Sequence, residues 1–171
     1  FTHAARRQEG ANRVVAAFLG GYGVVWAACG AAAFAADVAL HRAGGTVAWF
    51  DAHPWVAPAA ALAGAGAFQF SGLKDRCLDQ CRHPGPFLMR YYRRGTRGGF
   101  DLGRRHGLFC IGCCWALMLI MFVVGTGNLG WMLVLAAVMA AEKNLPWGRR
   151  LRTPLGLGLL AWSAGIVAVN A

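Results

Sequence analysis

Long apolar segments alternate with short basic segments along this chain. A helix that crosses a membrane needs about 20 mostly apolar residues, within a range of about 17–25. Five segments meet or approach this length, namely residues 14–40, 55–72, 106–125, 128–143 and 154–171. The pattern therefore predicts an all-α fold, a polytopic transmembrane helix bundle forming a single domain over residues 1–171. A basic loop is expected at residues 73–105.

The overall composition agrees with a membrane protein. Hydrophobic residues make up 57% of the 171 residues and charged residues only 14%, against about 25% charged in an average soluble domain. Clusters of Gly and Ala such as "GAGAF" and "GLGLLAWSAG" permit close contact between helices. We therefore expect the lipid bilayer to be a partner of this chain.

Basic residues are concentrated on one side of the predicted bundle. Of the 17 Lys and Arg residues, all except Arg42 lie in the N-terminal segment, in residues 73–105, or between the fourth and fifth helices. Cytoplasmic loops of membrane proteins carry such an excess. The distribution predicts that residues 73–105 are cytoplasmic and that the C-terminus lies outside. The net charge of +10 is then a topology signal, and no nucleic-acid partner is expected.

The cysteines carry the candidate chemistry. Cys29 stands alone among alanines, where a cysteine is usually a small hydrophobic residue. Cys77 and Cys81 in "LKDRCLDQCRHP" are i,i+4 neighbours if this segment is helical. The stretch "HGLFCIGCCW" places four further ligand-type side chains on one helical face, namely His106, Cys110, Cys113 and Cys114. Both groups fall at the cytoplasmic ends of neighbouring helices, as one shared site requires.

A soft metal ion is the favoured ligand of these side chains. Thiolates select Cu(I), zinc or iron–sulfur clusters, and clustered thiols in a reducing compartment are more often metal-binding or catalytic than disulfide-bonded. Cu(I) accepts two or three sulfur ligands, and Met118 and Met121 continue the line of sulfur atoms, so copper is favoured and zinc is possible. Packing remains the preferred interpretation of these two methionines. The predicted metal ligands are Cys77, Cys81, His106, Cys110, Cys113 and Cys114.

Two other classes of function compete with metal handling. Cys110 and Cys113 form a CxxC at a helix start, which favours thiolates, and a membrane thiol oxidoreductase could relay disulfides through Cys77 and Cys81. Such enzymes act on the extracytoplasmic side, however, whereas the charge pattern places these cysteines inside. Alternatively, the cysteines only pack helices in an accessory subunit of a larger membrane complex. No catalytic constellation is evident, so an enzyme is less favoured.

The few acidic residues have plain interpretations. Asp75, Asp79 and Asp101 are expected to pair with nearby basic residues. Glu142 ends the fourth helix, where a solvated position is preferred over a hydrogen bond from His106.

Four stretches resemble the predicted metal-binding integral membrane proteins of bacteria, over about residues 20–146. They are "LKDRCLDQCRHPGPFL", "GRRHGLFCIGCCWALMLIMF", "NLGWM" and "AEKNLP". The resemblance implies a bacterial inner-membrane protein with a metal site, but it implies no reaction. It marks as signature positions Cys77, Cys81, His106, Gly107, Cys110, Gly112, Cys113, Cys114, Trp115, Met118, Asn128, Trp131, Met132, Glu142 and Lys143. Members of that family usually open with a methionine-rich helix, so a sixth helix is expected before Phe1.

Overall fold

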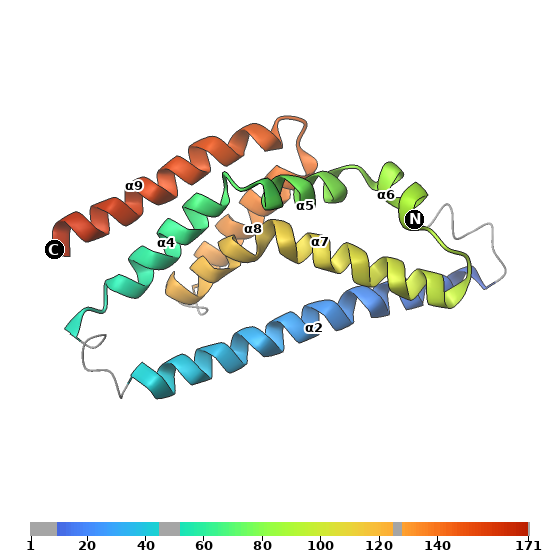
Figure 1. The fold of residues 1–171 in the computed structure, drawn as a ribbon, viewed down its shortest axis with the longest axis horizontal. Helices are drawn as coiled ribbons and strands as arrows, with labels where there is room; N and C mark the ends of the chain where they lie inside the picture. Colours follow the sequence, from blue (N-terminus) through green and yellow to red (C-terminus); the bar gives the residue numbers. More distant parts are fainter. Residues whose placement is uncertain (1–9, 45–51, 125–127, 171) are drawn as a thin grey trace. The chain divides into compact units, whose positions relative to one another are not determined.

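The computed structural model describes residues 10–44, 52–124 and 128–170, and this part of the chain is all α-helical (Figure 1). It contains seven α-helices and one short 3-10 helix, so the prediction of five helices was wrong. The elements are α2 (Ala11–Gly44), α4 (Val56–Phe68), α5 (Gly72–Arg82), α6 (Pro84–Tyr91), α7 (Gly95–Val124), α8 (Leu129–Asn144), η1 (Gly148–Leu151) and α9 (Arg152–Asn170). The sixth helix expected before Phe1 lies outside the described residues.

The basic segment at residues 73–105 is helical rather than a loop, which corrects the largest error of the sequence analysis. It forms most of α5, all of α6 and the first turns of α7. Asp101 accepts hydrogen bonds from Arg104 at 2.9 Å and from Arg105 at 2.8 Å. Pairs at these spacings stabilise a helix without any apolar residue. A search for apolar runs finds only apolar helices, and therefore it mistakes such polar helices for loops.

Two compact units can be distinguished, and each is described by itself. Unit 1 comprises residues 1–39 and 77–112, and unit 2 comprises residues 40–76 and 113–171. Helices α5 and α7 each contribute residues to both units. The boundary therefore does not coincide with a linker, and the single-domain organisation stays a prediction.

In unit 1, α2 packs against the N-terminal half of α7 through glycines spaced four residues apart. A Cβ atom at Gly99 would lie 2.6 Å from the carbonyl oxygen of Val14, and one at Gly103 would overlap the carbonyl oxygen of Phe18. Successive glycines along α7 contact successively later residues of α2. The two helices therefore run in the same direction (Figure 1). Small residues at this spacing let helix backbones approach closely.

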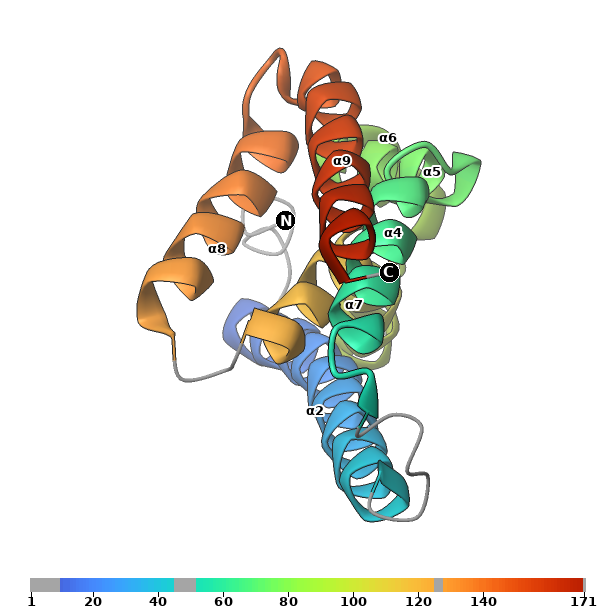
Figure 2. The same cartoon turned by 90° about the vertical axis from the view of Figure 1, so that its left-hand side faces the viewer.

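In unit 2, α4 packs along α9 in the opposite direction (Figure 2). A Cβ atom at Gly66 would lie 3.0 Å from the carbonyl oxygen of Gly156, while the Ser163 hydroxyl donates a 2.7 Å hydrogen bond to the carbonyl oxygen of Ala59. The unit has an apolar core formed by Leu62, Ala65, Ala116, Leu117, Ile120, Leu135 and Leu159. As in unit 1, small residues bring the helices together.

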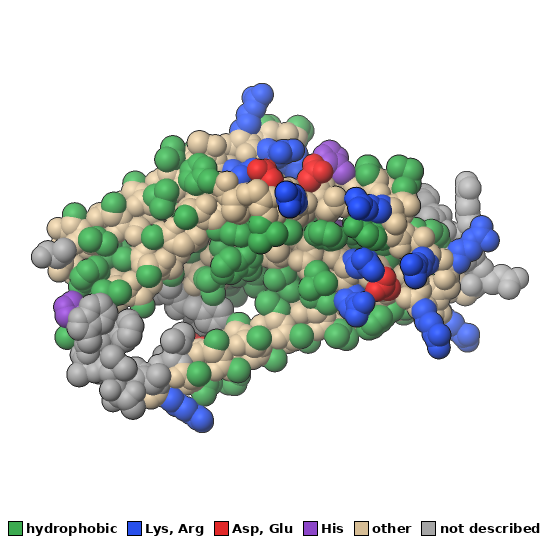
Figure 3. All heavy atoms as spheres, in the orientation of Figure 1, with side chains coloured by type: hydrophobic (Ala, Val, Ile, Leu, Met, Phe, Trp, Pro, Cys, Tyr) green, Lys and Arg blue, Asp and Glu red, His purple; other side chains and the backbone are tan. Residues whose placement is uncertain are grey.

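Among the described residues, three segments are long and apolar enough to cross a membrane, judged by length and composition alone. They are Ala11–Ala39, Gly95–Met121 and Gly148–Asn170. Helices α4 and α5 could form a fourth span with a 65° bend between them. Helix α8 has only 16 residues. In unit 1, apolar side chains follow α2, while Lys and Arg side chains gather over α6 and the start of α7 (Figure 3).

Candidate metal centre

The sulfur of Cys77 lies against the backbone of α7. Cys77 is buried on α5, and a Cβ atom at Gly112 would lie 2.7 Å from its Sγ. Any larger residue at position 112 would force this sulfur to move. Along the chain, Gly112 stands between Cys110 and Cys113, so a thiol of the first cysteine motif reaches the middle of the second. Cys81, one turn further along α5, is half-buried.

In unit 1, His106 and Cys110 face aromatic side chains of α2 and α6. The imidazole ring centroid lies 6.1 Å from those of Phe18 and Tyr22, and 5.4 Å from that of Phe87. The Tyr22 hydroxyl forms a 3.4 Å hydrogen bond with Cys110 Sγ, which is buried. Tyr22 was not among the predicted site residues. Its signal was the spacing of Phe18, Tyr22 and Trp26 by four, which places three aromatic rings on one face of α2.

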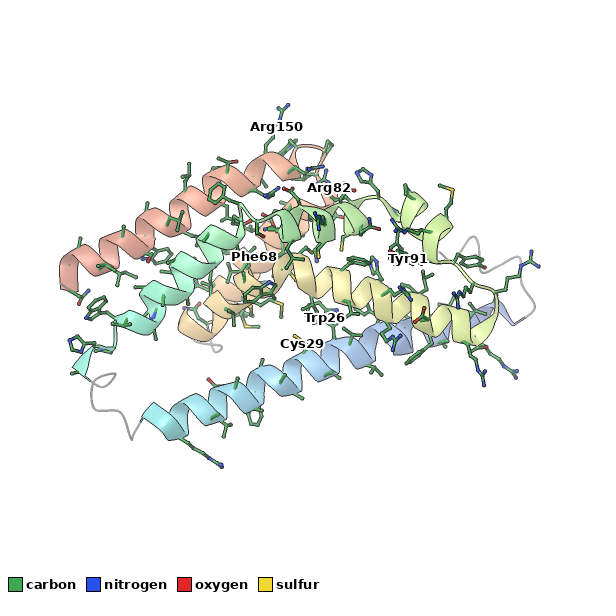
Figure 4. The ribbon with its side chains drawn as sticks, in the orientation of Figure 1. Trp26, Cys29, Phe68, Arg82, Tyr91 and Arg150 are labelled. Carbon is green, nitrogen blue, oxygen red and sulfur yellow. The ribbon has the colours of Figure 1, made fainter. Side chains whose placement is uncertain are left out.

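Basic side chains surround the aromatic contacts on the same part of α7. The Cζ atom of Arg105 lies 5.1 Å from the ring centroid of Tyr91, and that of Arg90 lies 5.6 Å from it (Figure 4). Contacts of this kind between a cation and a ring are favourable. Asp101 pairs with Arg104 and Arg105, and Asp79 lies 3.5 Å from His83. The expected pairing with nearby basic side chains is therefore confirmed for Asp101.

In unit 2, Cys113 and Cys114 are almost fully enclosed, with exposed fractions of 1% and 2%. Cys114 Sγ lies 3.9 Å from Met118 Sδ, one helical turn away. Sulfur atoms that share one ion lie about 4 Å apart, since each metal–sulfur bond is about 2.3 Å long. Met118, interpreted from the sequence as a packing residue, therefore brings a second soft donor to Cys114. Met121 packs against the apolar core.

A buried ion pair occupies the same unit. Lys74 Nζ donates hydrogen bonds to both carboxylate oxygens of Glu142 at 2.8 Å and also to the side-chain oxygen of Gln69. Lys74 is 0% exposed and Glu142 2%. The preferred interpretation of Glu142 as a solvated helix end was wrong, because α5 covers the end of α8 with its lysine. The other interpretation, a bond from His106, would join the two units and stays a prediction.

The break between α4 and α5 is held by α9. Arg152 donates hydrogen bonds to the carbonyl oxygen of Gln69 at 2.8 and 2.6 Å, and it also pairs with Asp75. Arg149 lies 3.4 Å from the same carboxylate. The carbonyl group that a helix end leaves without a partner therefore receives a guanidinium. Asp75 does pair with arginine, as expected, but with arginines far along the chain.

The contacts described above join predicted ligands to residues outside the predicted set. Cys77 reaches Gly112, Cys110 reaches Tyr22, and Cys114 reaches Met118. Within the described part of the chain, no group of three or more His, Cys, Asp or Glu side chains is close enough to hold a metal ion. The six-residue metal site therefore stays a prediction. None of the six cysteines, all within the described ranges, forms a disulfide.

One comparison with known proteins gives a match. A family model described as "PpoB2: Copper chaperone" matches residues 1–166, whereas no curated protein and no solved structure matches. The buried thiols and the Cys114–Met118 contact are soft donors of the kind that binds Cu(I). Since the match spans nearly the whole chain, the protein belongs to this copper chaperone family.

Proposed function

We propose that this protein is an integral protein of the bacterial inner membrane that carries Cu(I) as its cargo on cysteine thiolates of α5 and α7. The observation that carries this proposal is the position of the Cys77 sulfur against Gly112, between two cysteines of the second motif. A thiol of α5 therefore touches α7 beside one of its cysteine positions, which supports a site that takes ligands from both helices. Membership of a copper chaperone family supports copper as the ion.

The helix directions in unit 1 support the membrane arrangement. Helices α2 and α7 run in the same direction. If both cross the membrane, an odd number of crossings must lie between them. Helices α4, α5 and α6 are the described elements in that interval. Of these, α4 and α5 together are long enough to provide one bent crossing, whereas α6 has only eight residues. Broken membrane helices are tolerated where other groups satisfy the freed backbone, as Arg152 does here.

The helix directions in unit 2 support the same arrangement independently. Helices α4 and α9 run in opposite directions, which requires an even number of crossings between them. Helix α7 provides one of these, so α8 must provide the second despite its length of 16 residues. The result is five crossings. With the basic ends of the helices in the cytoplasm, the C-terminus is on the opposite side.

Buried thiols suit a carrier that has to release its ion. Cu(I) is held by as few as two sulfur atoms, and thiolates and thioethers both bind it. Such a site can pass the ion on by exchanging one sulfur at a time with a receiving protein. The Cys114–Met118 pair, with its sulfur atoms 3.9 Å apart, is a second position for the ion further along α7.

Copper binding by the full chain tests this proposal. The purified protein in detergent is titrated with Cu(I) under anaerobic conditions against the chromogenic chelator bicinchoninate. We expect Cys77→Ser, Cys110→Ser and Cys113→Ser each to lower the affinity by tenfold or more, because loss of a group that only supports a metal ligand already costs about tenfold or more. Cys29→Ser is the matched control, because Cys29 lies apart on α2, and it is expected to bind as the wild type does.

The same titration can contradict the proposal. If the triple variant of Cys77, Cys110 and Cys113 retains wild-type copper affinity, the cysteines serve packing. If the thiols of purified protein become alkylatable only after treatment with dithiothreitol, they form a disulfide, and a thiol oxidoreductase replaces the carrier.

A further inference from the structure

The buried Lys74–Glu142 pair lies beside a predicted copper ligand. Lys74 interacts electrostatically with Cys113, which is itself 1% exposed. On α5, Lys74 precedes Cys77 by three residues, so both side chains share one buried face of the helix. Cys77 in turn lies against Gly112, the residue before Cys113. Within unit 1, Cys77 thus contacts Gly112 of α7, and within unit 2, Lys74 interacts with Cys113, the next residue of α7.

Stability alone is a weak reason for such a pair. Removing two charges from water costs several kcal/mol per ion, and an apolar pair of similar size often stabilises a protein as well or better. Ionisable groups within membrane-spanning segments are rare, and they usually mark a functional site. The guanidinium of Arg152, the neighbouring cation, is occupied by Asp75 and by the carbonyl group of Gln69. Lys74, by contrast, interacts electrostatically with Cys113.

We propose that Lys74 supplies the counter-charge for the copper–thiolate complex and thereby favours Cu(I) over divalent ions. This inference rests on the proposed function. When two thiols bind Cu(I), they release two protons to water, and the resulting complex carries one negative charge. A complex of two thiolates with Zn²⁺ is neutral. A fixed positive charge beside Cys113 therefore stabilises the copper complex more than the zinc complex.

Glu142 has a different part in this arrangement. Its carboxylate holds the lysine ammonium through two hydrogen bonds of 2.8 Å and balances its charge while no cargo is bound. Once the copper–thiolate complex forms, the Glu142 carboxylate repels its negative charge, whereas the Lys74 ammonium attracts it. The two members of the pair are therefore expected to affect copper binding in opposite directions, which a purely structural pair would not do.

The experiment compares two variants that leave no unpaired buried carboxylate. Glu142→Gln keeps the lysine, and the double variant Lys74→Met/Glu142→Gln removes it from the same background. Arg150→Met is the matched control, because it removes one exposed positive charge that points away from the helices (Figure 4). For each full-length protein in detergent, affinities for Cu(I) and for Zn²⁺ are measured by chelator competition, together with the thermal unfolding midpoint.

We expect Glu142→Gln to bind Cu(I) at least as tightly as the wild type. The double variant should bind Cu(I) about tenfold more weakly than Glu142→Gln. It lacks the attraction between one positive charge and the anionic copper complex, which is strong in a poorly solvated site. Its affinity for Zn²⁺ should fall by a much smaller factor, so the Cu(I)/Zn²⁺ ratio drops. Arg150→Met should keep the wild-type ratio.

If Glu142→Gln and the double variant have the same ratio of Cu(I) affinity to Zn²⁺ affinity, the role of Lys74 is overturned, even if both variants bind copper. A loss of affinity for both ions by the same factor would also overturn it, because it would indicate a structural pair. Failure of the proposed function is distinguishable, since Cys113→Ser would then bind Cu(I) as the wild type does.

Discussion

The Tyr22 hydroxyl is a single group that touches a predicted copper ligand and can be removed cleanly. It lies 3.4 Å from Cys110 Sγ, while the ring of Tyr22 packs beside His106. Tyr22→Phe keeps the ring and deletes only the hydroxyl, which would donate to a Cys110 thiolate. A hydrogen bond contributes about 0.5–1.5 kcal/mol, so we expect Cu(I) affinity to fall by roughly two- to tenfold. Chelator competition under anaerobic conditions measures this change.

Tyr91→Phe is the matched control for that variant. It makes the same chemical change on a ring that lies beside Arg105, and copper affinity is expected to stay at the wild-type value. Both variants should keep their thermal unfolding midpoints within a few degrees, because each retains its ring contacts. Identical copper affinities for Tyr22→Phe and the wild type would contradict a role for this hydroxyl.

The cysteines of the candidate site can be predicted from the sequence, but the residues that surround them cannot. Cys77 and Cys110 are conspicuous because their spacing alone places each on a helical face with further cysteines. Tyr22 is 88 positions from Cys110, and their contact depends on the register of two helices, which no local pattern contains. Glu142 was misread for the same reason, since its partner Lys74 comes from another helix.

At the scale of elements, the glycines of α7 determine how closely α2 approaches. Glycine within a helix costs roughly 0.5–1 kcal/mol relative to alanine, so repeated glycines indicate a packing requirement. Gly103→Ala would place its methyl group on the carbonyl oxygen of Phe18, a backbone atom that cannot rotate away. Overpacking of this kind destabilises by about 1–3 kcal/mol. We expect a lower unfolding midpoint, measured by circular dichroism on the detergent-purified protein.

Gly23→Ala on α2 is the control for this substitution, because a Cβ atom there meets nothing within 4 Å. Alanine is the better helix former, so this variant should be as stable as the wild type or slightly more so. If Gly103→Ala unfolds at the same temperature as Gly23→Ala, the close contact between α2 and α7 is not the one that the structure describes.

Hydropathy located the apolar helices and missed the polar ones. The all-α class and the centres of α2, α4, α7, α8 and α9 follow from long apolar runs. Helix α6 begins at Pro84 and the start of α7 is held by Asp101, features of capping and charge pairing that an apolar-run search ignores. The 65° bend between α4 and α5 was missed because Arg152, which satisfies the carbonyl group of Gln69, is distant in sequence. Asn128 was marked as a signature position, and it caps α8 through the backbone N–H of Trp131.

At the scale of the whole molecule, the number of membrane crossings depends on the shortest helix. A helix of 16 residues, as in α8, is about 24 Å long at 1.5 Å per residue, whereas the hydrocarbon core is about 30 Å thick. A short span is accommodated by local thinning of the bilayer at a modest cost. The opposite directions of α4 and α9 require this crossing, because otherwise α9 would return to the membrane in the wrong direction.

Reporter fusions in a bacterial host test this arrangement directly. Alkaline phosphatase, which is active only outside the cytoplasm, is fused after Arg94, Asn144 or Asn170, and a fluorescent protein that matures in the cytoplasm is fused at the same positions. With five crossings and the basic segments inside, phosphatase should be active only after Asn170, while fluorescence should appear after Arg94 and Asn144. Fusion after Arg94 is the internal control, since that position precedes α7 and does not depend on whether α8 crosses.

Phosphatase activity after Asn144 would mean that α8 stays on the outer side. The antiparallel packing of α4 with α9 could then not exist in a membrane, and the five-crossing arrangement would have to be abandoned.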